Sequence, residues 1–121
     1  MHHASLVVSD TAKALAFYDG LLGLEVDVAR PDLGYPGAWL NVPGPGAQQI
    51  HLLEVPNPDP VSGRPVHGGR DRHIAFHARD LDALEQGLEH AGIAFTRSRS
   101  GRRALFCRDP DGNGLEFIEQ V

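Results

Sequence analysis

Apolar and polar residues alternate along two stretches of the chain that repeat one another. Residues 3–10 read HASLVVSD and residues 73–80 read HIAFHARD, and in each stretch an aspartate stands seven positions after a histidine. An alternation with a period of two residues is typical of a strand with one buried face. The matching stretches predict that the chain contains two copies of one supersecondary unit.

An amphipathic helix is predicted after each of the two aspartates. Apolar residues follow Asp10 and Asp80 at spacings of three and four, as they do along one face of a helix. An aspartate suits the N-cap because its carboxylate accepts hydrogen bonds from the unpaired N–H groups of the first turn. Gly23 and Gly92 stand where the two helices would end.

Three short strands are predicted after each helix, near residues 24–30, 37–42 and 48–55 and again near 93–97, 103–108 and 114–119. Each half therefore reads β-α-β-β-β. This order predicts an α+β fold of two paired βαβββ modules that form a curved mixed sheet around a concave metal-binding cleft. We expect one domain over residues 1–121, with module 1 at about 1–55, a linker at about 56–72 and module 2 at about 73–121.

Four side chains with the chemistry of metal ligands occupy equivalent positions in the two halves. His3 and His73 begin the first strands, and His51 and Glu116 lie in the last strands, 48 and 43 residues after the first histidine of their half. Strand alternation places all four on the face away from the helices. An approximate twofold between the halves would bring them together around one ion. Imidazole and carboxylate ligands suit Zn²⁺, Ni²⁺, Fe²⁺, Co²⁺ or Mn²⁺.

Composition and charge exclude several classes of protein. The net charge of −5 argues against a nucleic-acid partner held through its phosphates. No apolar stretch has the length of a membrane span, so no membrane partner is expected. The first residues lack the pattern of a signal peptide, and the lone Cys107 fits a reducing compartment. We therefore expect a cytoplasmic protein.

The motifs as a set resemble the vicinal oxygen chelate superfamily, also called the glyoxalase/bleomycin resistance protein/dioxygenase family. The resemblance covers nearly the whole chain. It implies metal binding by His3, His51, His73 and Glu116, and a small-molecule substrate that chelates the metal through two vicinal oxygens. It also implies a homodimer, and leaves open whether each site combines modules of one chain or of two. The motifs that carry it are H-x-x-L-x-V-x-D from His3, Gln49–Leu52, Arg72–Phe76 and Asp109–Phe117.

The resemblance is less specific for a reaction. It favours a glyoxalase-like lyase or isomerase in which Glu116 is the catalytic residue, the base. Two positions depart from that pattern: His51 stands where the second ligand is often glutamate, and Val7 stands where bacterial enzymes carry an arginine. Extradiol dioxygenases and fosfomycin thiol transferases fit less well, because Phe106 stands where both carry tyrosine.

A non-catalytic protein that binds an antibiotic or another small molecule, like the bleomycin-resistance members, remains the alternative to an enzyme. Such members usually lack the four ligands, so their presence here favours a metal and a reaction. Tyr35, Trp39 and Phe106 would be aromatic residues of a drug-binding cleft. Further predicted substrate contacts, whose arginines would pair with a carboxylate, are Ser5, His77, Arg103, Phe106 and Arg108.

Overall fold

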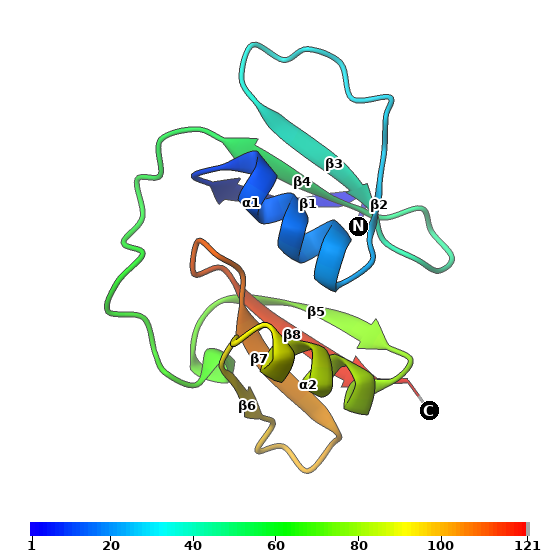
Figure 1. Cartoon of the computed structure of the whole chain (residues 1–121), viewed down its shortest axis with the longest axis vertical. Helices are drawn as coiled ribbons and strands as arrows, with labels where there is room; N and C mark the ends of the chain where they lie inside the picture. Colours follow the sequence, from blue (N-terminus) through cyan, green and yellow to red (C-terminus); the bar gives the residue numbers. More distant parts are fainter. Residues whose placement is uncertain (121) are drawn as a thin grey trace. The chain divides into compact units, whose positions relative to one another are not determined.

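The computed structural model describes residues 1–120, whose contacts divide them into two compact units. Unit 1 is Met1–Asp59, and unit 2 begins at Pro60. Each unit contains one four-stranded mixed sheet with a helix packed on one face (Figure 1). The predicted α+β fold of two βαβββ modules is confirmed. Within residues 1–120, no helix is long and apolar enough to cross a bilayer.

Unit 1 contains a first strand, a helix that changes type halfway, and three further strands. Its sheet has the order β1-β4-β3-β2, in which β1 and β4 run parallel and the other neighbours antiparallel. The elements are β1 (His3–Val8), α1 (Thr11–Leu15), the π-helix η1 (Ala16–Leu21), β2 (Glu25–Val26), β3 (Gly37–Asn41) and β4 (Gln49–Glu54).

Unit 2 repeats this arrangement. Its sheet has the order β5-β8-β7-β6, and the parallel pair is again formed by the first and last strands, β5 and β8. The elements are the 3₁₀ turn η2 (Gly68–Arg70), β5 (His73–Ala78), α2 (Leu81–His90), β6 (Phe95–Arg97), β7 (Ala104–Arg108) and β8 (Gly114–Glu119).

The two predicted N-caps are confirmed. The carboxylate of Asp10 accepts a hydrogen bond from the N–H of Lys13, and that of Asp80 accepts one from Ala83. Beyond each helix, Gly23 and Gly92 adopt positive φ angles of 75° and 71°, a conformation that favours glycine.

Two details of unit 1 differ from the sequence-based expectation. The first helix widens into η1, where the N–H of Leu22 donates to the carbonyl of Phe17, five residues back. This widening accompanies the burial of two adjacent aromatic side chains, Phe17 and Tyr18. The strand expected near residues 24–30 ends after Val26, because the Asp27 carboxylate accepts the N–H of Ala29 and forms a turn.

The apolar core of each unit lies between its sheet and its helix. Tyr18, Leu40, Ile50 and Leu52 are fully buried in unit 1, and Leu81, Leu88, Leu105 and Leu115 are fully buried in unit 2. In β4, Ile50 and Leu52 flank His51, and in β8, Leu115 precedes Glu116. Because neighbouring strand residues point to opposite faces, the packing that buries these apolar side chains turns His51 and Glu116 to the face away from the helix.

The part of the linker that precedes β5 is anchored to unit 2 through Asp71. Its carboxylate accepts hydrogen bonds from Arg64 at 3.1 Å and Arg108 at 2.9 Å. Burial alone would raise the pKa of Asp71, but the hydrogen bonds from Arg108 and from the N–H of Arg72, together with Arg64, hold the pKa below its usual value. Asp71 therefore fixes the backbone just before His73.

We expect Asp71→Asn to lower the free energy of unfolding by about 1 kcal/mol at neutral pH, because the charge that holds two guanidinium groups is lost. The stabilisation is present above the ordinary carboxyl pKa and disappears as the pH falls through the lowered pKa of Asp71. Urea unfolding at neutral and at strongly acidic pH measures both effects. Glu89→Gln, on an exposed residue of α2, is the matched control. An equal effect of both substitutions would contradict this role of Asp71.

Candidate metal centre

A histidine and a buried glutamate face each other on the sheet of unit 2. His73 begins β5 and Glu116 lies in the neighbouring strand β8, with 3.2 Å between Nε2 of His73 and Oε2 of Glu116. The other ring nitrogen of His73, Nδ1, donates a hydrogen bond of 2.9 Å to the carbonyl oxygen of Asp71, which can only accept. In the neutral ring, Nε2 therefore carries the lone pair.

The geometry of this pair suits a shared metal ion. A nitrogen and an oxygen this close repel each other through their lone pairs unless a proton or a metal cation lies between them. An ion bound to both at about 2.1 Å separates them by about 3.0 Å at a right angle and about 3.4 Å at a tetrahedral angle. The separation of 3.2 Å lies between these values. In metal-binding histidines, the ring nitrogen that does not bind the metal usually donates a hydrogen bond to a group such as a carbonyl oxygen, as Nδ1 of His73 does here.

Arg102 approaches the other oxygen of the same carboxylate. Its Nη2 donates to Oε1 of Glu116 at 3.1 Å. The Glu116 side chain is only 3% exposed, whereas that of Arg102 is 57% exposed. A buried carboxylate needs a compensating positive group. In the residues that the structure describes, the Arg102 guanidinium supplies this charge at Oε1, while Oε2 faces the ring of His73.

Phe106 and the linker enclose this pair on one side. The Phe106 ring meets the His73 ring edge to face at 5.1 Å and the His67 ring at 5.0 Å. His67 also shares a 2.7 Å hydrogen bond with the hydroxyl of Thr96, which ties the linker to β6. Gly68 lies directly over Phe106, and a Cβ at this position would come within 3.2 Å of that side chain.

Three aromatic rings stack in a row on the sheet of unit 1. The ring of His51, on β4, lies 3.9 Å from that of His3, and the ring of Trp39, on the strand at the other side of β4, lies 4.5 Å from it. His2 contacts His3 through their Nδ1 atoms at 2.8 Å, which leaves Nε2 of His3 available. His3 and His51 thus form the second candidate ligand pair.

A chain of hydrogen bonds fixes the ring of His51. The amide nitrogen of Gln49 donates to the Asp27 carboxylate at 2.8 Å and to the side-chain carbonyl of Asn41 at 2.9 Å. The amide oxygen of Gln49 therefore faces Nε2 of His51, at 2.9 Å, and accepts a hydrogen bond from its N–H. Nδ1 of His51 is left with the lone pair, ready to bind a cation.

The protonation of His51 is also set by its surroundings. Burial lowers the pKa of His51 from its usual value, and the nearby rings of His3 and His2 and the Arg30 guanidinium lower it further, against a smaller opposing effect of Asp27. A neutral imidazole is the form that binds metal. By contrast, burial and the Asp109 carboxylate raise the pKa of Cys107 to about 12, so its thiol stays protonated at neutral pH. The chemistry of the donor set is thus nitrogen and oxygen.

Residues 1–117 match the model of the Glyoxalase/Bleomycin resistance protein/Dioxygenase superfamily. The chain belongs to this superfamily. It is 32% identical to Glyoxylase I 4 of Arabidopsis thaliana over 97% of this chain and 68% of that protein. It is 30% identical to lactoylglutathione lyase of Haemophilus influenzae over 97% of this chain and 90% of that protein.

A solved structure supports the same assignment. The superfamily member from Sphaerobacter thermophilus is 28% identical, with a TM-score of 0.65 over 99% of this chain and 96% of that chain. The named relatives include enzymes, which agrees with the glyoxalase-type family expected from the sequence.

The other predicted substrate contacts of this superfamily member lie in different surroundings. Ser5 and His77 are exposed on β1 and β5, and Phe106 is buried beside His73. Arg103 instead pairs with Asp82 and Glu119, toward α2. Arg108 donates to Asp71 and to the carbonyl oxygens of Pro65 and Gly112, so it secures the linker and the turn before β8.

Sequence reasoning missed three polar contacts of the candidate ligands and their surroundings. Arg102 lies in the connection just before β7, outside any strand, so alternation gave no signal for its contact with Glu116. Gln49 stands two residues before His51 on the same face of β4, so strand alternation offered a signal for it. His67 lies in the linker, where no periodicity indicates a contact.

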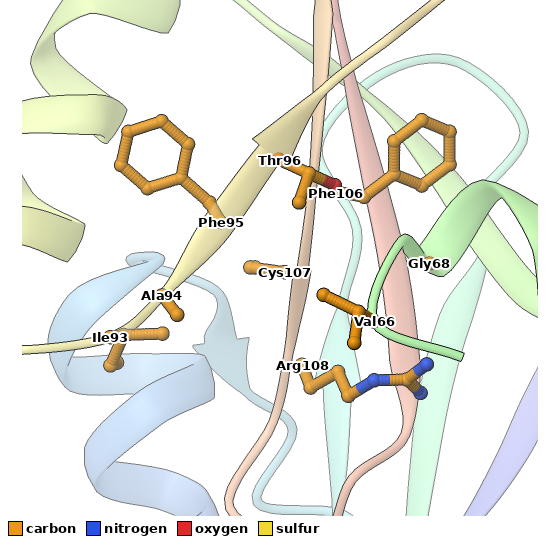
Figure 2. Close-up of a pocket in the computed structure, with 9 residues that line it drawn as sticks. All are labelled: Val66, Gly68, Ile93, Ala94, Phe95, Thr96, Phe106, Cys107 and Arg108. Atoms are coloured by element: carbon orange, nitrogen blue, oxygen red, sulfur yellow. The ribbon is translucent and has the colours of Figure 1, made fainter. Parts of the chain in front are cut away.

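A small cavity lies beside this region in unit 2. Its volume is about 270 Å³. Figure 2 shows Ile93, Ala94 and Phe95 on one side, Val66 and Gly68 on the other, and Cys107 and Arg108 of β7 between them. Neither His73 nor Glu116 lines it, and Phe106 contributes both to the cavity and to the His73 contact.

We expect Gln49→Leu to release the ring of His51, because the oxygen that accepts the hydrogen bond from its Nε2–H is lost. Long-range ¹H–¹⁵N NMR of the imidazoles reads the tautomer directly: the wild type shows His51 with its proton on Nε2, and the variant shows a mixture. Zn²⁺ affinity falls by about 10-fold or more, as is usual when the outer partner of a ligating histidine is removed. Gln86→Leu, on an exposed residue of α2, is the control and should change neither quantity. An unchanged tautomer in Gln49→Leu would refute the proposed hydrogen-bond chain.

Proposed function

We propose that the protein is a divalent-metal-dependent enzyme of glyoxalase type, a lyase or isomerase that acts on a small substrate through two vicinal oxygens. The observation that carries the proposal is the pair in unit 2, where a tautomerically fixed Nε2 of His73 faces a buried carboxylate oxygen of Glu116 at 3.2 Å. The sequence identity of 30% with lactoylglutathione lyase of Haemophilus influenzae, which extends over most of both chains, supports a related chemistry.

In this proposal, His3, His51, His73 and Glu116 bind one Zn²⁺, Ni²⁺, Fe²⁺, Co²⁺ or Mn²⁺ ion. Each unit supplies one pair of neighbouring ligands, and within residues 1–120 no three such side chains form a cluster in the structure. A complete site therefore requires one pair from each module, taken from one chain or from two. We propose a homodimer with two such sites.

The metal, when bound, would act as a Lewis acid toward the two vicinal oxygens of the substrate. The protein's own residues provide the rest. His3, His51 and His73 would each offer one ring nitrogen to the ion, and the rings of His51 and His73 are fixed by hydrogen bonds to Gln49 and Asp71. Glu116 is the group that would accept the substrate proton, since it is the buried carboxylate in the ligand set. Phe106 keeps water from the side of His73 that it covers.

A binding protein without catalysis is the second candidate. The stacking of Trp39 on His51 and of Phe106 against His73 places one aromatic ring beside each ligand pair, as a flat ligand would need. Tight binding of an aromatic antibiotic by metal-free protein, without metal uptake after reconstitution, would favour this candidate over the enzyme.

We expect about one equivalent of transition metal per chain in untagged wild-type protein, measured by elemental analysis after reconstitution and desalting. His73→Ala and Glu116→Gln each remove one ligand, and should lose bound metal while far-UV circular dichroism stays unchanged. Glu116→Gln should also lose hemithioacetal isomerisation by at least about 100-fold. His90→Ala, on the exposed end of α2, is the control and should keep full metal. Stoichiometric metal in His73→Ala would sink the ligand assignment.

Mixed dimers distinguish a site within one chain from a site shared by two. One variant carries His3→Ala and His51→Ala, and the other carries His73→Ala and Glu116→Gln. If each site combines modules of two chains, coexpression restores metal in the mixed dimer to about half the wild-type amount. If each site lies within one chain, no combination restores it. Both outcomes are compatible with a four-ligand site. Tight metal binding by each of the two variants when expressed alone would contradict that site.

A further inference from the structure

Arg102 differs from the neighbouring arginines in what it binds. Arg103 and Arg108 each contact two or more acceptors of the protein: Arg103 pairs with Asp82 and Glu119, and Arg108 with Asp71 and two backbone carbonyl oxygens. For Arg102, the structure gives Glu116 as the single partner among residues 1–120. It comes from the connection between β6 and β7, and more than half of its side chain is exposed.

This single partner is a carboxylate that the proposed function assigns to the metal. In the structure, Arg102 supplies positive charge to a Glu116 side chain that is 3% exposed. A divalent cation on Glu116 would supply more positive charge at a shorter distance. The compensation by Arg102 would then be redundant, and the like charges of the metal and the guanidinium would repel each other. Metal binding therefore weakens the ion pair between Glu116 and Arg102.

A guanidinium released in this way has a specific affinity. Its N–H groups form a planar fork that matches a carboxylate in two parallel hydrogen bonds. Arg102 would stay next to the substrate, because its partner Glu116 is a metal ligand and the substrate chelates that metal. An anionic group on the substrate would offer the guanidinium the carboxylate that Glu116 no longer provides.

We propose that Arg102 is a specificity-determining residue: it pairs with Glu116 while the site lacks metal, and binds a substrate carboxylate next to the vicinal oxygens once the metal is present. The inference rests on the proposed metal site. It defines the substrate class as anionic molecules that carry a carboxylate in addition to the two chelating oxygens.

Two small molecules distinguish chelation of the metal from binding of an additional carboxylate by Arg102. Glycolate offers a hydroxyl and a carboxylate oxygen to a metal, and tartronate offers the same two with one additional carboxylate. Isothermal titration of Zn²⁺-loaded full-length protein gives the ratio of their affinities. We expect Arg102→Gln to reduce the preference for tartronate by at least 10-fold with little change for glycolate, and Arg102→Lys to retain part of it. Arg99→Gln, an exposed arginine of the same connection, should keep the wild-type ratio.

Zn²⁺ titration of the same variants tests the first half of the proposal. If Arg102 competes with the metal for Glu116, Arg102→Gln binds Zn²⁺ as tightly as the wild type or several-fold more tightly. A purely structural Arg102 would instead position Glu116 for the metal, and its loss would weaken Zn²⁺ binding 10-fold or more. Circular dichroism and the melting temperature show that each variant is folded.

The outcomes have separate meanings. An unchanged tartronate preference in folded, Zn²⁺-binding Arg102→Gln overturns the assignment of Arg102 and leaves the metal site standing. Weaker Zn²⁺ binding in that variant also overturns it. Failure of the wild type to bind any of the candidate metals refutes the proposed function, and this inference with it.

Discussion

Glu116 carries a carboxylate that is buried in the sheet of unit 2, and the proposed metal site follows from this burial. Its side chain is almost completely covered, yet it lies in a strand between the apolar residues Leu115 and Phe117 that pack the core of unit 2. Such a charge costs free energy unless positive groups or hydrogen-bond donors compensate it. Arg102 and His73 approach its two oxygens separately, and the oxygen that faces His73 has the separation and chemistry that a shared metal ion requires.

In both units, a hydrogen bond to an oxygen acceptor fixes the tautomer and orientation of one histidine ring. In unit 2 the carbonyl oxygen of Asp71 holds the proton of His73 on Nδ1, and in unit 1 the amide oxygen of Gln49 holds that of His51 on Nε2. These holding groups are themselves fixed, Asp71 by Arg64 and Arg108, and Gln49 by Asp27 and Asn41. A ring held in one tautomer and one orientation loses little entropy on binding an ion, so the network favours a preformed ligand pair.

The repeat of residues 3–10 in 73–80 was sufficient to predict the two modules, because a strand, an N-cap and a helix each have a local signature. Alternation also predicted which strand residues turn away from the core. It did not predict η1 or the early end of β2, since these depend on the burial of Phe17 and Tyr18 and on the side chain of Asp27. The sequence predicted Arg103 and Arg108 as substrate contacts but not Arg102, because Arg102 lies in the connection before β7, where alternation gives no indication. The ligand set itself stays a prediction.

X-ray absorption at the zinc edge of Zn²⁺-loaded wild-type protein reports directly which atoms are bound to the ion. The four-ligand site predicts a first shell of nitrogen and oxygen alone, with the outer-shell scattering of the imidazoles of His3, His51 and His73 and a contribution from the Glu116 carboxylate. Substitution of His51 by alanine should remove one imidazole from that pattern. A sulfur neighbour from Cys107, or a spectrum with fewer imidazoles that the His51 and His73 variants leave unchanged, would contradict the four-ligand site.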